Sequence, residues 1–212
     1  MVHYLVYVCL LLGWVTWCAL HSALISITAT DSIKRKLGEG FRFYRLLYNI
    51  FSLLTLTPLL YYSASIHQKP IFHWHGLPVI IQCLLIAKSC FLFIAGCWNY
   101  SLSTFLGIRQ IRTRRENGAL SDTGTFVASG IHRIIRHPWY LGGMMIVWAR
   151  DLSLLTILIN IVITCYFIIG TYLEERKLLR LYGGQYREYQ AKVSMFFPYK
   201  WLKARILHLP RY

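Results

Sequence analysis

The chain has 212 residues, of which 56% are hydrophobic and 15% are charged, and its formal net charge is +15. Soluble domains are about 45–50% apolar, so this composition, with a mean hydropathy of +0.45, predicts an integral membrane protein. The basic residues cluster at the ends of apolar runs, where they meet anionic lipid. Their placement argues against a nucleic-acid-binding protein, which would carry a basic stripe on a polar fold.

Five apolar runs predict an all-α integral membrane fold with about five transmembrane helices, at residues 2–27, 44–64, 78–100, 138–149 and 152–173. A crossing helix needs about 20 residues, so the fourth run is too short alone. It either begins upstream, near Gly130, or is tilted. Arg150 and Asp151 leave only a tight turn between the last two runs, which therefore form a helical hairpin.

Residues 174–198 follow the last run and predict a cytoplasmic, C-terminal amphipathic helix. Leu and Tyr recur there at three- or four-residue spacing, and Gly183 and Gly184 interrupt the pattern with a bend. Such a helix could close a cofactor pocket from below.

Positive charge sets the predicted topology. Twenty of the 23 Lys and Arg residues lie in residues 29–45, in residues 101–137 or after Glu174. Positive charge marks the cytoplasmic side, so we predict an outside N-terminus and a cytoplasmic C-terminus, with the bacterial inner membrane as the favoured host. The whole chain, 1–212, reads as one membrane domain, with three N-terminal spans in residues 1–100.

Two charged pairs flank the predicted hairpin. Arg136 and His137 precede its first helix, and Glu174 and Glu175 close its second. Pro138 suits a first helical turn, and a helix start favours an anion. Charges this close to a bilayer point to a functional site. A zwitterionic ligand fits, with its carboxylate at the basic pair and its ammonium at the glutamates. Interfacial anchoring and salt bridges are the alternative.

These residues belong to longer motifs that resemble a known superfamily. The chain has SG at 129–130, RHPWY at 136–140 and EERKLLRLYGGQYREYQAKVSMFFP at 174–198. This pattern, over residues 126–198, closely resembles the isoprenylcysteine carboxyl methyltransferase and phospholipid methyltransferase superfamily. His21 with Ser22, YRLLYN at 44–49 and FLGIRQ at 105–110 are similar to its NnrU and methanethiol S-methyltransferase branch.

The resemblance implies that residues 126–198 form a core that binds S-adenosyl-L-methionine (SAM) at the cytoplasmic face. It implies a cofactor site that Glu174 completes by holding the ammonium group, with support from Glu175. The other expected cofactor-binding residues are Phe126, Val127, His132, His137, Pro138, Trp139 and Tyr140. His132 departs from the Tyr of many members, so we expect a different shape at the edge of the pocket.

The resemblance implies methyl transfer to a small thiol or lipophilic acceptor, with methanethiol-type S-methylation as the first expectation. A thiol must ionise to react, and Arg136 and His132 are the candidate catalytic residues. Prenylcysteine enzymes of the superfamily carry an Arg four residues before the glutamate pair, where this chain has Gly170. Prenylcysteine carboxyl or phospholipid N-methylation is the alternative.

Other readings and partners stay open. An NADPH-dependent reductase and a non-catalytic NnrU-like protein are alternatives to the enzyme. Membrane lipid is an expected partner and nucleic acid is not. His73 and His75 lack a third ligand in sight, so we expect no metal site. Lys88, inside the third run, needs a buried partner, a water-filled cavity or a route to the surface.

Overall fold

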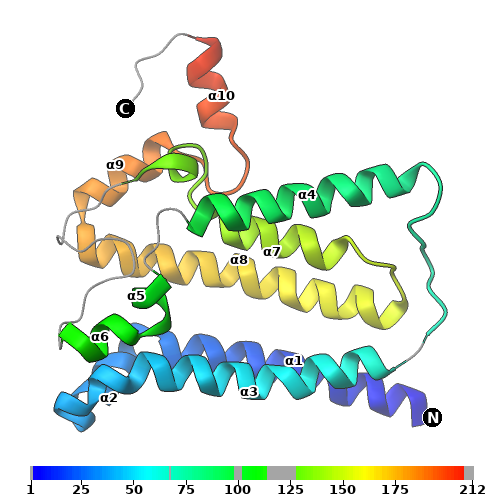
Figure 1. Cartoon of the computed structure of the whole chain (residues 1–212), viewed down its shortest axis with the longest axis horizontal. Helices are drawn as coiled ribbons and strands as arrows, with labels where there is room; N and C mark the ends of the chain where they lie inside the picture. The colour runs from blue at the N-terminus through cyan, green and yellow to red at the C-terminus, as the bar shows by residue number, and fades with distance from the viewer. Residues whose placement is uncertain (1, 67, 98–101, 114–127, 208–212) are drawn as a thin grey trace.

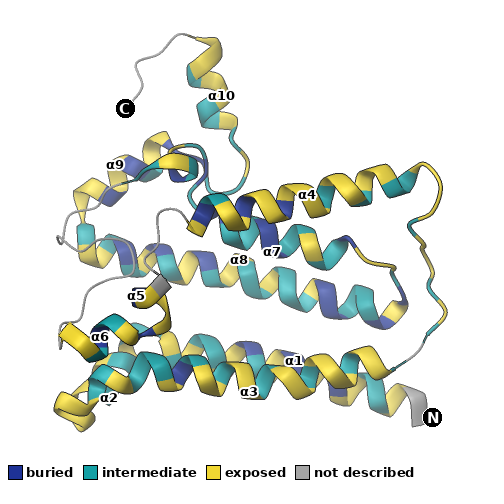
Figure 2. Ribbon diagram, in the orientation of Figure 1, coloured by how far each residue is buried: buried dark blue, intermediate teal, exposed yellow. Residues whose placement is uncertain are grey.

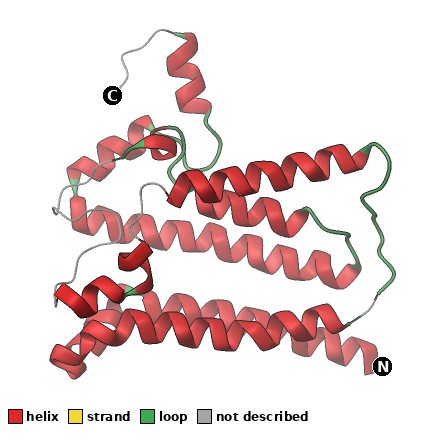
Figure 3. Cartoon of the chain, in the orientation of Figure 1, coloured by secondary structure: helices red, strands yellow, loops and turns green. Residues whose placement is uncertain are grey.

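The computed structural model describes residues 2–66, 68–97, 102–113 and 128–207, and these residues form helices and loops with no strand (Figures 1 and 3). The long helices are α1 (Val2–Ile25), α3 (Tyr44–Ser65), α4 (Pro78–Cys97), α7 (Pro138–Trp148) and α8 (Leu154–Tyr182). The short elements are α2 (Ile27–Leu37), η1 (Gly38–Phe43), α5 (Leu102–Leu106), α6 (Ile108–Thr113), η2 (Gly130–Arg133), α9 (Gly184–Lys192) and α10 (Tyr199–Ile206).

The long helices pack one against the next in the order α3, α1, α8, α7 and α4. α1 and α3 lie side by side, and α8 packs on α1 from one side and on α7 from the other, with α4 outermost (Figure 1). Two indole N–H groups of α1 donate hydrogen bonds to α3. Trp14 Nε1 donates to Ser63 Oγ at 3.0 Å, and Trp17 Nε1 donates to Thr55 Oγ1 at 3.0 Å. Side-chain hydrogen bonds of this kind hold helices together where burial of apolar surface gives no driving force.

Within the part of the chain that the structure describes, four helical stretches are long and apolar enough to cross a membrane: Tyr4–Ile25, Ile27–Ser65, Pro78–Cys97 and Leu154–Tyr182. Large apolar residues of these helices are exposed, among them Leu53, Leu54, Leu84 and Ile94. Figure 2 shows many exposed residues along α3 and α4. A soluble protein rarely leaves so much contiguous apolar surface in water. These helices indicate an integral membrane protein.

α7 differs from the other long helices in length. Its 11 residues would span about 16 Å at 1.5 Å per residue, which is too short for a crossing. It does not begin upstream, because η2 is a 3₁₀ turn and residues 134–137 are not helical. Instead, α7 is held in the bundle by close packing against α4 and α8. A Cβ on Gly143 would lie 2.7 Å from the Phe167 ring, and one on Gly142 would lie 3.3 Å from the Ser89 carbonyl oxygen.

α8 continues past the glutamate pair, which the sequence placed at the helix end. Ser153 caps its N-terminus in a capping box with Thr156, and the helix ends at Tyr182, where Gly183 has a φ of +52°. The predicted boundary at Glu174 is therefore wrong. The predicted boundary followed the change from apolar to charged residues at Glu174. The helix itself ends nine residues later, where Gly183 adopts a positive φ. The predicted bend at Gly183 and Gly184 is confirmed.

The short elements gather at one end of the bundle. α2, α5, α6, α9 and α10 lie at the end opposite the N-terminus and the connection between α3 and α4 (Figure 1). The described parts of the segments that the sequence assigned to the cytoplasmic side thus share one end of the molecule.

Candidate functional site

Main-chain hydrogen bonds hold the segment before α7 against the segment after α9. The amide of Arg136 donates to the Ser194 carbonyl at 2.9 Å, and the amide of His137 donates to the Met195 carbonyl at 3.1 Å. Ile135 and Ser194 form an isolated parallel bridge. Pro138, which has no N–H to donate, then begins α7 at its first position. The side chains of Arg136 and His137 are thereby directed toward α8.

Arg136 is buried against Glu175. Its Nε donates to Glu175 Oε1 at 2.6 Å, and each of the two side chains is 8% exposed. Nη1 of Arg136 donates to the Gln190 carbonyl at 3.2 Å and to the Val193 carbonyl. The side-chain amide of Gln190 donates to the other carboxylate oxygen, Oε2, at 2.7 Å. The guanidinium thus faces into the protein, although the sequence led us to expect that it would face a ligand.

His137 lies between the two glutamates of α8. Its Nε2 is 3.0 Å from Glu175 Oε1, and its Nδ1 is 3.7 Å from Glu174 Oε2. The Glu174 side chain is 32% exposed, whereas that of Glu175 is 8% exposed. Consecutive residues on a helix point in directions about 100° apart, so one glutamate enters the cluster and the other reaches its edge. Glu174 is the carboxylate that a ligand could meet.

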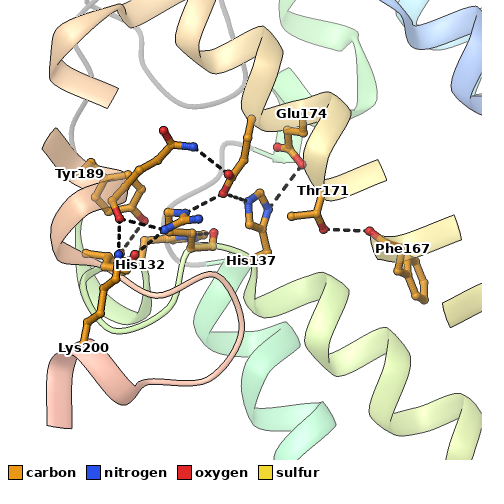
Figure 4. A network of polar contacts seen from close by, with 11 residues as sticks. His132, His137, Phe167, Thr171, Glu174, Tyr189 and Lys200 are labelled. Carbon is orange, nitrogen blue, oxygen red and sulfur yellow. Dashed lines mark hydrogen bonds and ion pairs between the residues drawn. The ribbon is translucent and has the colours of Figure 1, made fainter. Parts of the chain in front are cut away.

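His132 lies on the other side of this cluster. Figure 4 shows His132 and Tyr189 on one side of His137, and Glu174, Thr171 and Phe167 on the other. Nδ1 of His132 is 3.2 Å from the Arg136 carbonyl oxygen, and the Tyr189 hydroxyl donates to the His132 carbonyl at 2.6 Å. Burial lowers the pKa of His132 and raises the pKa of Tyr189. Both side chains are therefore neutral near pH 7.

The aromatic residues that follow Pro138 point in different directions. Trp139 Nε1 donates to the Phe93 carbonyl of α4 at 3.1 Å, so this side chain turns toward α4. The Tyr140 ring lies 5.5 Å from the His137 ring and 5.7 Å from the Phe167 ring. A Cβ on Gly170 would lie 3.6 Å from Tyr140 Cε1. Tyr140 thus borders the cluster, and Phe126 and Val127 lie outside the described residues.

The three N-terminal motifs meet in the structure. The Tyr48 hydroxyl is 2.7 Å from Nε2 of His21, and Ser52 Oγ is 3.1 Å from its Nδ1. Arg45 Nε and Asn49 Nδ2 both donate to the Phe105 carbonyl at 3.1 Å. These contacts fix the corner between α5 and α6 on the start of α3.

Sequence reasoning missed one residue of the cluster. Gln190 bridges Glu175 and Arg136, but a glutamine in a polar helix carries no signal that distinguishes it from a surface residue.

The opposite end of the molecule holds the His73 and His75 pair. His73 Nδ1 lies 2.9 Å from Asp151 Oδ2, and the backbone N–H of Trp74 donates to Oδ1 at 3.0 Å. These contacts tie the connection between α3 and α4 to the turn before α8. The described residues contain no group of three or more His, Cys, Asp or Glu that could hold a metal ion.

The chain is similar to several curated methyltransferases. A methanethiol S-methyltransferase of Pseudomonas deceptionensis is 37% identical over 76 residues, which is 35% of this chain and 29% of the relative. Methanethiol S-methyltransferase 1 of Bradyrhizobium diazoefficiens is 30% identical over 141 residues, 61% of this chain and 49% of the relative. The Mycobacterium tuberculosis enzyme of the same name is 33% identical over 116 residues, 51% and 47% respectively.

These alignments cover half or less of the length of each of these three relatives. No solved structure matches the chain. The profile of the NnrU protein family matches residues 9–152, more than half of the chain. That stretch runs from α1 to the turn before α8, and it includes all three N-terminal motifs as well as Arg136 and His137. The chain belongs to the NnrU protein family.

Proposed function

We propose that this protein is an integral membrane methyltransferase that moves a methyl group from SAM to a small thiol, as in the S-methylation of methanethiol. The observation that carries the proposal is the position of Glu174. Its carboxylate is partly exposed at the edge of an otherwise buried cluster, with the His137 imidazole 3.7 Å away. The names of the similar enzymes support the choice of acceptor.

The residues at this edge fit the amino-acid end of SAM. Glu174 would hold the ammonium group, and Glu175 would support it through the shared contact with His137. His137, Pro138 and Tyr140 would border the bound nucleoside, together with the predicted Phe126, Val127, His132 and Trp139. When bound, SAM supplies a methyl group already activated by its sulfonium.

The protein would contribute alignment and a dry environment. Apolar helices surround the cluster on the bilayer side, and exclusion of water makes a thiolate more reactive. His132, neutral near pH 7 because burial lowers its pKa, has the protonation state that a proton acceptor needs. Arg136, paired with Glu175, would fix the position of that carboxylate and of His137. The two residues thus remain our candidates for the thiol step.

Gly170 favours a small acceptor. It stands where prenylcysteine enzymes of the superfamily carry the Arg that binds the substrate carboxylate, and it packs beside Tyr140. Without a cation at this position, a prenylcysteine carboxylate lacks the partner that would compensate its loss of water. Methanethiol carries no such group, so it needs no replacement for the Arg.

The test is a transfer assay on the purified protein with SAM labelled in its methyl group. We expect label in dimethyl sulfide when methanethiol is offered, and none in phosphatidylethanolamine or in a farnesylated cysteine. Glu174→Gln should abolish transfer and weaken S-adenosylhomocysteine binding, whereas Arg176→Gln, an exposed neighbour on α8, should do neither.

Other results would reject the proposal. Label that appears only in a lipid or a prenylcysteine would exclude the thiol as acceptor. Binding of NADPH but not of S-adenosylhomocysteine would favour a reductase. No binding of either would support a non-catalytic role.

A further inference from the structure

α10 runs across the direction of the long helices and extends beyond α4, level with the C-terminal end of that helix (Figure 1). α4 has 20 residues, so it is about 30 Å long at 1.5 Å per residue. The hydrocarbon core of a bilayer is also about 30 Å thick. Because α4 matches this thickness, its two ends mark the two membrane surfaces, and α10 lies along one of them.

One face of α10 is apolar and exposed. Tyr199, Leu202 and Ile206 are all exposed, and their three- and four-residue spacing places them on one side of the helix. Phe197, just before the helix, and Leu207, at its C-cap, are exposed as well. This much apolar surface beside a membrane surface fits insertion among lipid chains better than contact with water.

Cations flank the apolar face of α10. At about 100° per residue, Lys203 and Arg205 fall on opposite sides of this face, and both are exposed. Cζ of Arg205 lies 5.1 Å from the centroid of the Trp201 ring. Cations beside an aromatic residue are typical of helices that lie in the interface, where the charged ends reach phosphates and the stems cover apolar surface. An anionic headgroup therefore complements both cations.

The first turn of α10 is attached to the cluster around Glu175. The backbone N–H of Lys200 donates to Ser194 Oγ at 3.0 Å, and Lys200 Nζ donates to the Gln190 carbonyl at 2.7 Å. Nη1 of Arg136 donates to the same Gln190 carbonyl, and Figure 4 shows Lys200 in this network. The Ser194 carbonyl accepts the amide of Arg136. The position of α10 is therefore coupled to that of the segment before α7.

We propose that α10 is an interfacial anchor that binds an anionic phospholipid surface. Its apolar face enters the outer part of the acyl-chain region, and Lys203 and Arg205 bind lipid phosphates. Through Lys200, the anchor holds residues 193–198, and with them Arg136, at the membrane surface. This inference goes beyond the proposed function and does not depend on which cofactor or acceptor the protein uses.

The test measures how lipids quench a fluorescent label on α10. The full chain, in a variant without the six native cysteines, carries a bimane label on Ile206→Cys or, as the control, on Ala204→Cys. It is placed in nanodiscs of phosphatidylcholine and phosphatidylglycerol. Bromine atoms near the top of the acyl chains quench only a label close to them. We expect strong quenching at position 206 and weak quenching at position 204, which faces away from the apolar face.

A second comparison identifies the headgroup. Bromine is placed on either phosphatidylglycerol or phosphatidylcholine at the same mole fraction. Each cation near an anionic surface strengthens binding about fivefold, so brominated phosphatidylglycerol should quench the label at position 206 more strongly.

Matched variants test which cations are responsible. Lys203→Gln/Arg205→Gln should remove most of the preference for phosphatidylglycerol. Arg180→Gln/Arg187→Gln removes the same charge from exposed positions on α8 and α9 and should keep the preference. High salt should weaken it without any substitution in these cations.

Two results overturn the inference. Equal or absent quenching at positions 206 and 204 would show that α10 does not dock on the bilayer, and its apolar face would then await another occupant, such as an acidic protein. Equal quenching by the two brominated lipids, or a preference that survives Lys203→Gln/Arg205→Gln, would show that these cations do not bind anionic headgroups. Neither result bears on the proposed function, which the transfer assay tests separately.

Discussion

Arg136 and Glu175, 39 residues apart in the chain, form a buried ion pair with a distance of 2.6 Å between Nε and Oε1. The pair joins the segment before α7 to the C-terminal part of α8. Gln190 extends the same network to α9 by donating to the second carboxylate oxygen. One carboxylate therefore joins three segments of the chain: the segment before α7, α8 and α9.

Arg136→Met should destabilise the protein strongly. It leaves the Glu175 carboxylate buried without its guanidinium, and breaking a buried pair by removing one partner costs about 3–5 kcal/mol. Thermal unfolding in detergent, followed by intrinsic fluorescence, would show a large fall in Tm. Arg180→Met removes an exposed cation from the same end of α8 and should leave the Tm almost unchanged.

The double variant Arg136→Met/Glu175→Gln checks the cause. It removes the unpaired charge, so its loss should be smaller than the sum of the two single losses. Additive losses would show that the two side chains do not act as a pair.

Gly143→Ala should destabilise the packing of α7 on α8. The new Cβ would lie 2.7 Å from the Phe167 ring, and overpacking of this kind costs about 1–3 kcal/mol. Gly184→Ala is the matched control, because a Cβ there meets no atom within 4 Å. In a helix alanine is about 1 kcal/mol better than glycine, so the two variants should shift the Tm in opposite directions. Equal shifts would contradict this packing.

His132 should make stability fall as the pH falls. Burial lowers its pKa in the folded protein, so the unfolded chain takes up a proton first, near its ordinary pKa of about 6.5. The stability is fully present above this pH and declines as the pH drops toward the folded pKa, with a slope of at most about 1.4 kcal/mol per pH unit. His132→Gln should flatten the Tm profile between pH 8 and pH 5. A variant profile parallel to that of the wild type would show that His132 does not titrate on unfolding.

The predicted topology can be tested by cysteine labelling in intact bacterial cells. In a variant without the six native cysteines, Lys69→Cys lies in the connection between α3 and α4 and should react with an impermeant maleimide added outside. Arg180→Cys lies in the last turn of α8, and this end of α8 is opposite the connection between α3 and α4 (Figure 1). It should react only after the cells are permeabilised. The reverse pattern would invert the assigned orientation.

The sequence predicted the helices well where composition changes sharply. α3 was expected at residues 44–64 and runs over Tyr44–Ser65, because its ends coincide with the change from apolar to polar residues. α8 was expected to stop at residue 173 and continues to Tyr182. Buried pairing of Glu175 with Arg136 and His137 lets charged residues continue the helix, and hydropathy cannot register a partner 38 or 39 residues away.

The sequence by itself determined the chemistry of this protein: an apolar chain with its cations at one predicted face, and a basic and an acidic pair beside the same hairpin. Only the tertiary structure decided what each of these groups does. It turned Arg136 inward to Glu175, left Glu174 at the edge and brought Arg45 to the Phe105 carbonyl. Residue type and spacing follow from local sequence, whereas the partner of a charge depends on which distant helix packs against it.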